Sequence, residues 1–153
     1  FEMATLIKDA PISRVVEVGG GYGGLCKTLS VVCDFDEYIL VDLPEAVAVQ
    51  EKYLKNFPEV YAKCKFISCD DVEEVKDVDL FISNYALSEC DYDTQVNYYD
   101  KLVANSKFAY IIYNLVNFND FYYNKFTERM SERFEFTTEK DYENTVILAK
   151  ERN

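Results

Sequence analysis

The sequence predicts an α/β fold, with a mostly parallel seven-stranded sheet, helices on both faces and an antiparallel strand at the C-terminal end. Three observations lead to this prediction. Short runs rich in β-branched and aromatic residues alternate with segments of helical periodicity. All five glycines fall in one loop, directly after a strand-like run. Two strand-like runs close the chain, with no helical segment between them.

The first strand and the first helix flank the glycine loop. Residues 14–18 form an apolar-rich run that is typical of a short strand. The helix is expected at residues 24–32, where Leu25, Leu29 and Val32 lie on one face. The loop therefore joins the carboxyl end of a strand to the start of a helix.

A second strand is expected at residues 38–42, and it ends in an acid. Pro44 suits the first turn of the next helix, because an N–H group there would have no partner within the helix. Glu51 and Lys55 form an i,i+4 pair in this helix. Pro58 marks its end.

The alternation continues to the C-terminal end. Strands are expected at residues 65–69, 80–83, 108–113, 134–137 and 145–150, and helices at 93–104 and 120–133. The 108–113 run is apolar enough to be buried on both faces of the sheet, as central parallel strands are. The last two strands are expected to pair with each other.

Composition limits the class of protein. The chain has 153 residues, 49% hydrophobic and 16% aromatic, which is enough for a core of its own. Its formal net charge of −12 argues against nucleic acid or an anionic membrane as a partner. The longest apolar runs are too short to span a bilayer.

The five cysteines are scattered, without a CxxC pair, which favours free thiols in a reducing cytoplasm over disulfides or zinc. Histidine is absent, so the commonest general base is missing. No repeat or low-complexity linker divides the chain, and we expect a single domain over residues 1–153. Because the chain begins with Phe1, we expect it to lack an N-terminal part that binds the substrate.

Glycines and polar residues mark the carboxyl ends of four expected strands. Ligands bind beyond these ends in parallel α/β sheets. The residues at these ends are Gly19 to Gly24, Asp42, Asp70, Asp71 and Asn84. We therefore expect them to surround one ligand site.

The glycine loop fits two ligand-binding patterns. Gly19, Gly21 and Gly24 satisfy GxGxxG, the spacing of dinucleotide-binding loops. Gly19, Gly21 and Gly23 satisfy GxGxG, which Glu17 precedes. Glycines let the backbone approach a ligand closely, and a loop before a helix offers free N–H groups. A tight turn required only for packing is the remaining explanation.

Three blocks carry a resemblance to a known family. Residues 17–23 (EVGGGYG) resemble motif I of the class I S-adenosylmethionine-dependent methyltransferases, and residues 38–44 (YILVDLP) resemble that family's second strand with its terminal acid. Residues 79–89 (DLFISNYALSE) are similar to a segment of the bacterial sugar O-methyltransferases. The resemblance runs from about Val15 to Lys150. It implies a Rossmann-like domain that uses S-adenosylmethionine to methylate a sugar or glycan hydroxyl.

The resemblance also implies a role for each strand end. The cofactor-binding residues that it implies are Glu17, Gly19, Gly20, Gly21, Tyr22, Gly23, Asp42, Leu43, Asp70, Asp71 and Asn84. The loop would pass the methionine part of the cofactor, and Glu17 would help to order the loop and the bound amino group. Asp42 would accept hydrogen bonds from the ribose hydroxyls. Asp70 or Asp71 would meet the adenine amino group, and Asn84 would lie beside the transferred methyl group.

Each acid also has a purely structural explanation. Glu17 could be a strand acid held by backbone N–H groups, although an unpaired buried carboxylate is costly, which favours a functional role. Asp42 and Glu45 have the spacing of a helix capping box. Asp70 and Asp71 could form a solvated acidic turn that starts a helix.

Methylation of a sugar hydroxyl needs a base to remove its proton, or a metal ion to lower its pKa. Without histidine, the candidates for the base are Glu89, Asp91, Tyr85 or a group in the missing N-terminal part. We favour Glu89, with Tyr85 in the same loop facing the acceptor. A divalent ion held by oxygen ligands is an open alternative, although no cluster of ligands demands one.

Two other functions stay open. An NAD(P)-dependent oxidoreductase would explain the glycine loop and Asp42 equally well, but it explains the 79–89 segment and the closing strand pair less well. A catalytically inactive methyltransferase-like scaffold would be consistent with the absence of an assigned base. The expected partner is a small molecule or a glycan, with no nucleic acid and no membrane.

Overall fold

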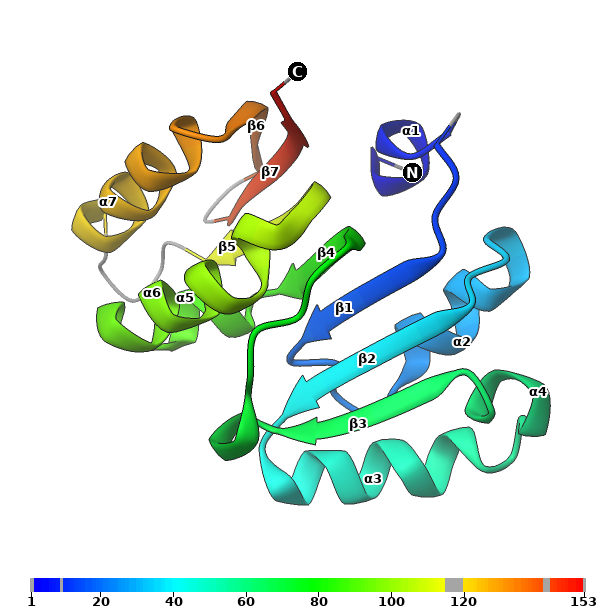
Figure 1. Cartoon of the computed structure of the whole chain (residues 1–153). Coiled ribbons are helices and arrows are strands. Elements are labelled where there is room, and N and C mark those ends of the chain that lie inside the picture. The colour runs from blue at the N-terminus through cyan, green and yellow to red at the C-terminus, as the bar shows by residue number, and fades with distance from the viewer. Residues whose placement is uncertain (1, 9, 115–119, 142–143, 153) are drawn as a thin grey trace.

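The computed structural model describes residues 2–8, 10–114, 120–141 and 144–152. In this part of the chain, seven strands form one sheet in the order β3-β2-β1-β4-β5-β7-β6 (Figure 1). The strands are β1 (Arg14–Val18), β2 (Glu37–Asp42), β3 (Cys64–Ser68), β4 (Val78–Asn84), β5 (Ser106–Asn114), β6 (Phe134–Asp141) and β7 (Asn144–Glu151). Strands β1 to β5 are parallel, and β7 is antiparallel to both β5 and β6. The predicted fold class is confirmed.

Helices cover both faces of the sheet. They are α1 (Glu2–Leu6), α2 (Gly24–Val32), α3 (Pro44–Leu54), α4 (Pro58–Tyr61), α5 (Ala86–Glu89), α6 (Tyr92–Lys101) and α7 (Asp120–Ser131), with 3-10 turns η1 (Cys69–Asp71) and η2 (Val103–Asn105). Side chains of α1 to α4 pack on one face, around Leu40 and Leu80. Side chains of α5 to α7 pack on the other, around Phe81 and Ile111. Each face therefore has its own hydrophobic core.

The topology places two loops at one crevice. The chain moves outward from β1 through β2 to β3, and then returns to β4 on the other side of β1. The loops that follow β1 and β4 consequently leave the same edge of the sheet in opposite directions (Figure 1). This reversal point is where ligands bind in open α/β sheets.

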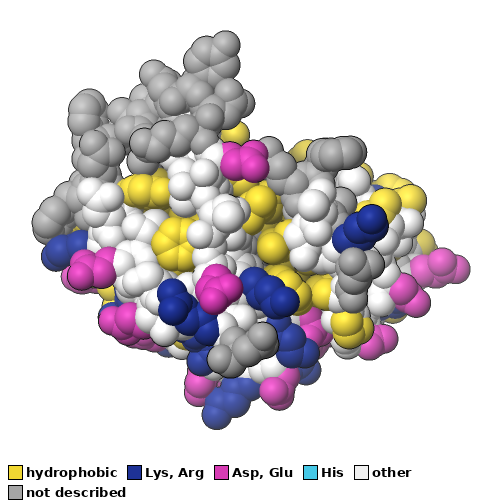
Figure 2. Space-filling view, turned by 90° about the horizontal axis from the view of Figure 1, so that it is seen from above, with side chains coloured by type: hydrophobic (Ala, Val, Ile, Leu, Met, Phe, Trp, Pro, Cys, Tyr) yellow, Lys and Arg dark blue, Asp and Glu magenta, His cyan; other side chains and the backbone are white. Residues whose placement is uncertain are grey.

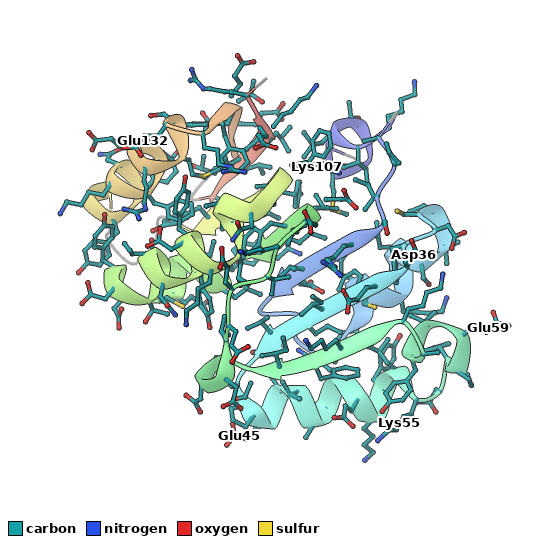
Figure 3. All side chains as sticks on the ribbon, viewed as in Figure 1. Asp36, Glu45, Lys55, Glu59, Lys107 and Glu132 are labelled. Atoms are coloured by element: carbon teal, nitrogen blue, oxygen red, sulfur yellow. The ribbon has the colours of Figure 1, made fainter. Side chains whose placement is uncertain are left out.

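Asp79 ties together the opposite, amino-terminal edge of the sheet. Its carboxylate accepts hydrogen bonds from the backbone N–H groups of Ser13 (2.8 Å) and Arg14 (2.9 Å), and from Lys107 Nζ (2.6 Å). Burial opposes ionisation of Asp79, but these hydrogen bonds hold its pKa below the usual value. Figure 3 shows Lys107 at this edge, away from Glu45 at the start of α3.

The structure differs from the expected elements mainly in the helices. The helix after Pro44 ends at Leu54, because the amide of Asn56 donates to the carbonyls of Lys52 and Tyr53 and closes the last turn. Pro58 then opens the separate helix α4. Helices α1 and α5 were not predicted, since each has too few residues for a periodic pattern.

Candidate functional site

A cavity of about 360 Å³ opens at the carboxyl ends of β1 and β2. It lies between these strand ends and the segment that contains α5 and α6. Its lining residues are Val18, Gly19, Val41, Asp42, Leu43, Cys69, Ala86, Glu89, Cys90, Thr94 and Tyr98. Of the expected site residues, Gly19, Asp42, Leu43 and Glu89 are thus brought together, although they come from three separate stretches of sequence.

Gly19 must be a glycine for two reasons. Its φ is +77°, in the left-handed region. A Cβ atom at this position would also lie 2.2 Å from the Cβ atom of Ala86, at the start of α5. The loop after β1 therefore packs directly on the segment after β4. Packing explains this glycine, and it also holds the loop backbone at the cavity.

The other loop residues lie outside the lining of the cavity. Gly21 has a φ of +57°, and a Cβ atom there would meet nothing within 4 Å, so this side of the loop is open. The ring of Tyr22 turns toward α3 and packs edge-on against Tyr53, with ring centroids 4.9 Å apart. Tyr22 therefore covers the start of α2 and is placed for packing between the loop and α3.

Asp42 is positioned by two hydrogen bonds. Its Oδ1 accepts from the backbone N–H of Leu43 (2.9 Å), and its Oδ2 accepts from Gln50 Nε2 (2.8 Å). Leu43, rather than Asp42, occupies the N-cap position of α3, and no side chain caps that helix end. The capping-box explanation of Asp42 and Glu45 is therefore wrong. The carboxylate instead lies on the wall of the cavity.

Glu17 lies beneath the glycine loop. Its side chain is on the α2 face of β1, it is 2% exposed, and its Oε2 accepts a hydrogen bond from the hydroxyl of Tyr38 (2.8 Å). A Cβ atom on Gly20 would be 3.2 Å from the same oxygen. Burial raises the pKa of Glu17 to about 7, the Tyr38 hydrogen bond opposes this rise, and the charge of Asp42 adds to it. Glu17 therefore supports the loop from below and does not line the cavity.

The two acids after β3 are adjacent residues of the 3-10 turn η1. Asp71 lines a different hollow, beside the edge strand β3. Burial is the main cause that raises the pKa of the cavity residue Tyr98 to about 12, and the nearby Cys69, Cys90, Asp42 and Asp70 add to it. The lining residues of the cavity include Cys69 but neither Asp70 nor Asp71, so the choice between the two acids stays a prediction.

The segment after β4 is held in an unusual conformation. Tyr85 has a φ of +71°, which is rare for a bulky residue, and it is 40% exposed. Its backbone N–H donates to the carbonyl of Ile112 (2.8 Å), and its carbonyl accepts from Ser88 Oγ. The Oδ1 atom of Asn84 is buried and has no hydrogen-bond partner among the described residues. Strained backbone and unpaired polar atoms are features that cluster at functional sites.

Two of the candidate bases have different surroundings. The carboxyl-bearing residue Glu89 closes α5 and lines the cavity. Asp91 is the N-cap of α6, and its carboxylate accepts from the backbone N–H of Thr94 (2.8 Å), which lowers its pKa. Asp91 thus has a structural task as a helix cap, whereas Glu89 faces the ligand space.

The sequence did not point to the wall that α6 provides. Thr94 and Tyr98 are one helical turn apart and both line the cavity, together with Cys90. Their i,i+4 spacing places both side chains on the same face of a helix, and this is the signal in the sequence from which a shared wall could be predicted. The buried residues of α6 are Gln95, Tyr98 and Tyr99.

Other features of the described residues carry less information. A larger cavity of about 550 Å³ lies between α1 and α2, lined mainly by apolar side chains and away from the strand ends. Figure 2 shows the face of the molecule seen from above Figure 1, where hydrophobic side chains reach the surface between acidic and basic ones.

The described residues include no group of three or more Cys, Asp or Glu side chains arranged to hold a metal ion. None of their helices has the length and apolarity needed to cross a membrane.

Neither a family model nor a curated protein matches this sequence. Solved structures do match. The mitomycin 7-O-methyltransferase MmcR is similar over 92% of this chain and 49% of its own, with 13% identity and a TM-score of 0.68. The methyltransferase domain of bacterial CtHen1 is similar over 97% of this chain and 95% of its own, with 13% identity and a TM-score of 0.72. M. capricolum TrmK, solved with S-adenosyl-homocysteine, is similar over 100% of this chain and 68% of its own, with 11% identity and a TM-score of 0.65.

The chain spans about half the length of MmcR. The identities are low, so the likeness concerns the fold. In this chain β7 lies between β5 and β6 and is antiparallel to both. The described chain has the Rossmann-like fold of these methyltransferases.

Proposed function

We propose that this chain binds S-adenosylmethionine and transfers its methyl group to an oxygen nucleophile, a hydroxyl of a sugar or glycan. One observation carries the proposal: a single cavity at the strand reversal point is lined by Gly19, Asp42 and Glu89. The structures of MmcR and TrmK add support, because a methyltransferase and a complex with S-adenosyl-homocysteine share this fold.

The lining residues suit the cofactor. A volume of about 360 Å³ lies within the range of small-ligand sites. Asp42 uses two of its acceptor positions within the protein, and a carboxylate has about four, so the ribose hydroxyls can still donate to it. Cys69, Cys90 and Tyr98 offer a less polar wall for the adenine ring. Glu17 does not line the cavity, and its proposed role is to support from below the loop that would pass the methionine end.

The sulfonium of the cofactor would supply an already activated methyl group. The chain's own residues then have two tasks, to align the acceptor oxygen with that methyl group and to take its proton. Glu89 is the residue we propose as the base, since it lines the cavity, whereas the carboxylate of Asp91 is engaged as the cap of α6. Asn84 and Tyr85, at the end of β4, would position the acceptor.

An NAD(P)-dependent oxidoreductase is the alternative that the glycine loop left open. The dinucleotide-binding fold has six parallel strands in the order 3-2-1-4-5-6. Here the sixth position is taken by the antiparallel strand β7. The topology therefore favours methyl transfer over hydride transfer.

The test is isothermal calorimetry of the chain with S-adenosylmethionine, S-adenosylhomocysteine and NADH. We expect the first two to bind and NADH not to bind. Asp42→Ala is expected to weaken binding at least about tenfold, the value of one or two lost hydrogen bonds. The matched control is Asp36→Ala, an acid directly before the first residue of the same strand, which should bind normally. Binding of NADH, or no binding of either sulfur ligand, would overturn the proposal.

A further inference from the structure

Cys26 and Cys64 form a pair of neighbouring thiols below the glycine loop. Cys26 is in the first turn of α2, two residues after Gly24, and Cys64 is the first residue of β3. Their Sγ atoms are 3.6 Å apart, although the residues are 38 positions apart in sequence. All five cysteines of the chain are free thiols. The fold itself therefore brings two thiols into contact.

The two thiols differ in access and in acidity. Cys26 is fully buried, whereas Cys64 is partly exposed and its Sγ donates to the carbonyl of Val60 (3.2 Å). The hydrogen bond with Cys64 and burial raise the pKa of the Cys26 thiol, and the same hydrogen bond lowers the pKa of Cys64. Cys64 is thus the thiol that a small oxidant reaches first and that attacks it as a thiolate.

The pair is connected to the candidate ligand site. Cys64 is the register partner of Tyr38, and the hydroxyl of Tyr38 donates to Glu17 beneath Gly20. Gly23, the N-cap of α2, is three residues before Cys26 and has a φ of +88°. Figure 1 shows α2 beginning directly after the loop that follows β1. A shift of the first turn of α2 would consequently move the loop.

We propose that hydrogen peroxide oxidises Cys26 and Cys64 to a reversible disulfide, which moves the first turn of α2 and weakens ligand binding at the glycine loop. A disulfide has an S–S distance of about 2.05 Å, so the two sulfurs must approach by about 1.5 Å. Side-chain rotation and a small displacement of α2 against β3 together provide this movement. The effect on the ligand rests on the proposed function, whereas formation of the disulfide does not.

The chemistry balances with peroxide as the oxidant. The Cys64 thiolate attacks one peroxide oxygen, the O–O bond breaks, and the leaving hydroxide takes up a proton to become water. The Cys26 thiol then attacks the sulfenic sulfur of Cys64 and passes its proton to the leaving hydroxide, so that the S–S bond forms, the S–O bond breaks and a second water is released. The two sulfurs together lose two electrons, and the peroxide gains them. A dithiol such as dithiothreitol reverses the reaction.

The disulfide is tested by counting thiols with maleimide after unfolding, using intact mass. The reduced chain should carry five maleimide groups and the peroxide-treated chain three, because two of the five thiols are then paired. Dithiothreitol should restore five. Cys64→Ser should carry four before and after peroxide, whereas Cys33→Ser, the matched control, should fall from four to two. Five groups on the treated chain, or a loss of two in Cys64→Ser, would overturn the proposal.

The effect on the loop is measured in two ways. Amide hydrogen exchange of residues 19–26 should change on oxidation of the chain and of Cys33→Ser, but not of Cys64→Ser. Calorimetry with S-adenosylhomocysteine should show binding weakened about fivefold or more in the same two proteins. If the reduced chain binds nothing, the proposed function fails while the disulfide and exchange results still stand. A disulfide that changes neither exchange nor affinity would refute the coupling.

Discussion

At the scale of single residues, Glu17 is a carboxylic acid buried beneath the glycine loop. The side chain is 2% exposed and accepts a hydrogen bond from the hydroxyl of Tyr38. Its pKa is raised to about 7, chiefly by burial. Below the pKa of the unfolded chain, about 4.5, both states are protonated and Glu17 costs no stability. As the pH rises toward about 7, the unfolded chain loses the proton first, so folding becomes less favourable.

We predict that Glu17→Gln removes this pH dependence. From pH 5 to pH 8 the natural chain should lose on the order of 3 kcal/mol of unfolding free energy through Glu17, since one pKa unit corresponds to about 1.4 kcal/mol. The variant should be flatter over this window and more stable at pH 8. Urea unfolding at both pH values measures the difference. Glu37→Gln, on an exposed ion pair, is the control that should leave the slope unchanged. A variant with the natural slope would show that Glu17 ionises normally.

Glu89 is the residue to test for proton removal. Glu89→Gln keeps the size of the side chain and removes its basicity, so methyl transfer should slow by about 10²- to 10⁴-fold. Binding of S-adenosylhomocysteine should change little, because the proposed role concerns the acceptor. The rate is followed as S-adenosylhomocysteine formed with a panel of sugars and glycans. Asp93→Asn, in the first turn of α6, is the matched control and should keep the natural rate. An unchanged rate in Glu89→Gln would assign the base elsewhere.

At the scale of elements, the glycine loop is fixed by its contact with α5. Gly19 and Gly21 both have positive φ, but only Gly19 faces another atom, the Cβ of Ala86. Gly21→Ala should therefore cost only the strain of a left-handed residue, about 1 kcal/mol of unfolding free energy. Gly19→Ala adds overpacking and should cost about 1–3 kcal/mol more.

The double variant Gly19→Ala with Ala86→Gly separates these two causes. Removing the Cβ atom of Ala86 should restore most of the overpacking loss and none of the backbone strain. Urea unfolding of the two single variants and the double variant gives the coupling free energy. If the two substitutions are simply additive, the loop and α5 do not touch as described.

The elements also show what could be predicted from the sequence. The seven strands were predicted within a few residues, because most of them are compact runs of apolar residues bounded by turn residues. Gly19 and Asp42 were predicted as site residues because a strand end positions them by backbone alone. Tyr98 and Cys90 were not, since their place on the cavity depends on how α5 and α6 dock on the sheet. The capping box of Asp42 and Glu45 was a wrong prediction, because the carboxylate of Asp42 instead accepts a hydrogen bond from Gln50, eight positions away.

At the scale of the whole molecule, the net charge limits which class of acceptor molecule can bind. The chain has 16 Lys and Arg and 28 Asp and Glu, which gives a formal net charge of −12. Several of the basic side chains are also paired with acids, among them Arg14 with Glu37, Lys107 with Asp79 and Arg133 with Glu151. An RNA-binding surface needs a cluster of unpaired basic groups. The small RNA methyltransferase HEN1 shares this fold at 13% identity, so the point needs a direct test.

We predict that the chain does not bind RNA at physiological salt. Release of counterions from phosphates drives such binding, and a protein of this charge offers few cations to release them. Fluorescence anisotropy of a labelled single-stranded RNA should stay constant up to about 10 μM protein, with and without S-adenosylhomocysteine. Labelled polylysine is the positive control, since it should bind this acidic chain and dissociate as salt is added. Saturable RNA binding that weakens with salt would mean that a local basic surface outweighs the net charge, and the proposed acceptor would then change from a glycan to a nucleic acid.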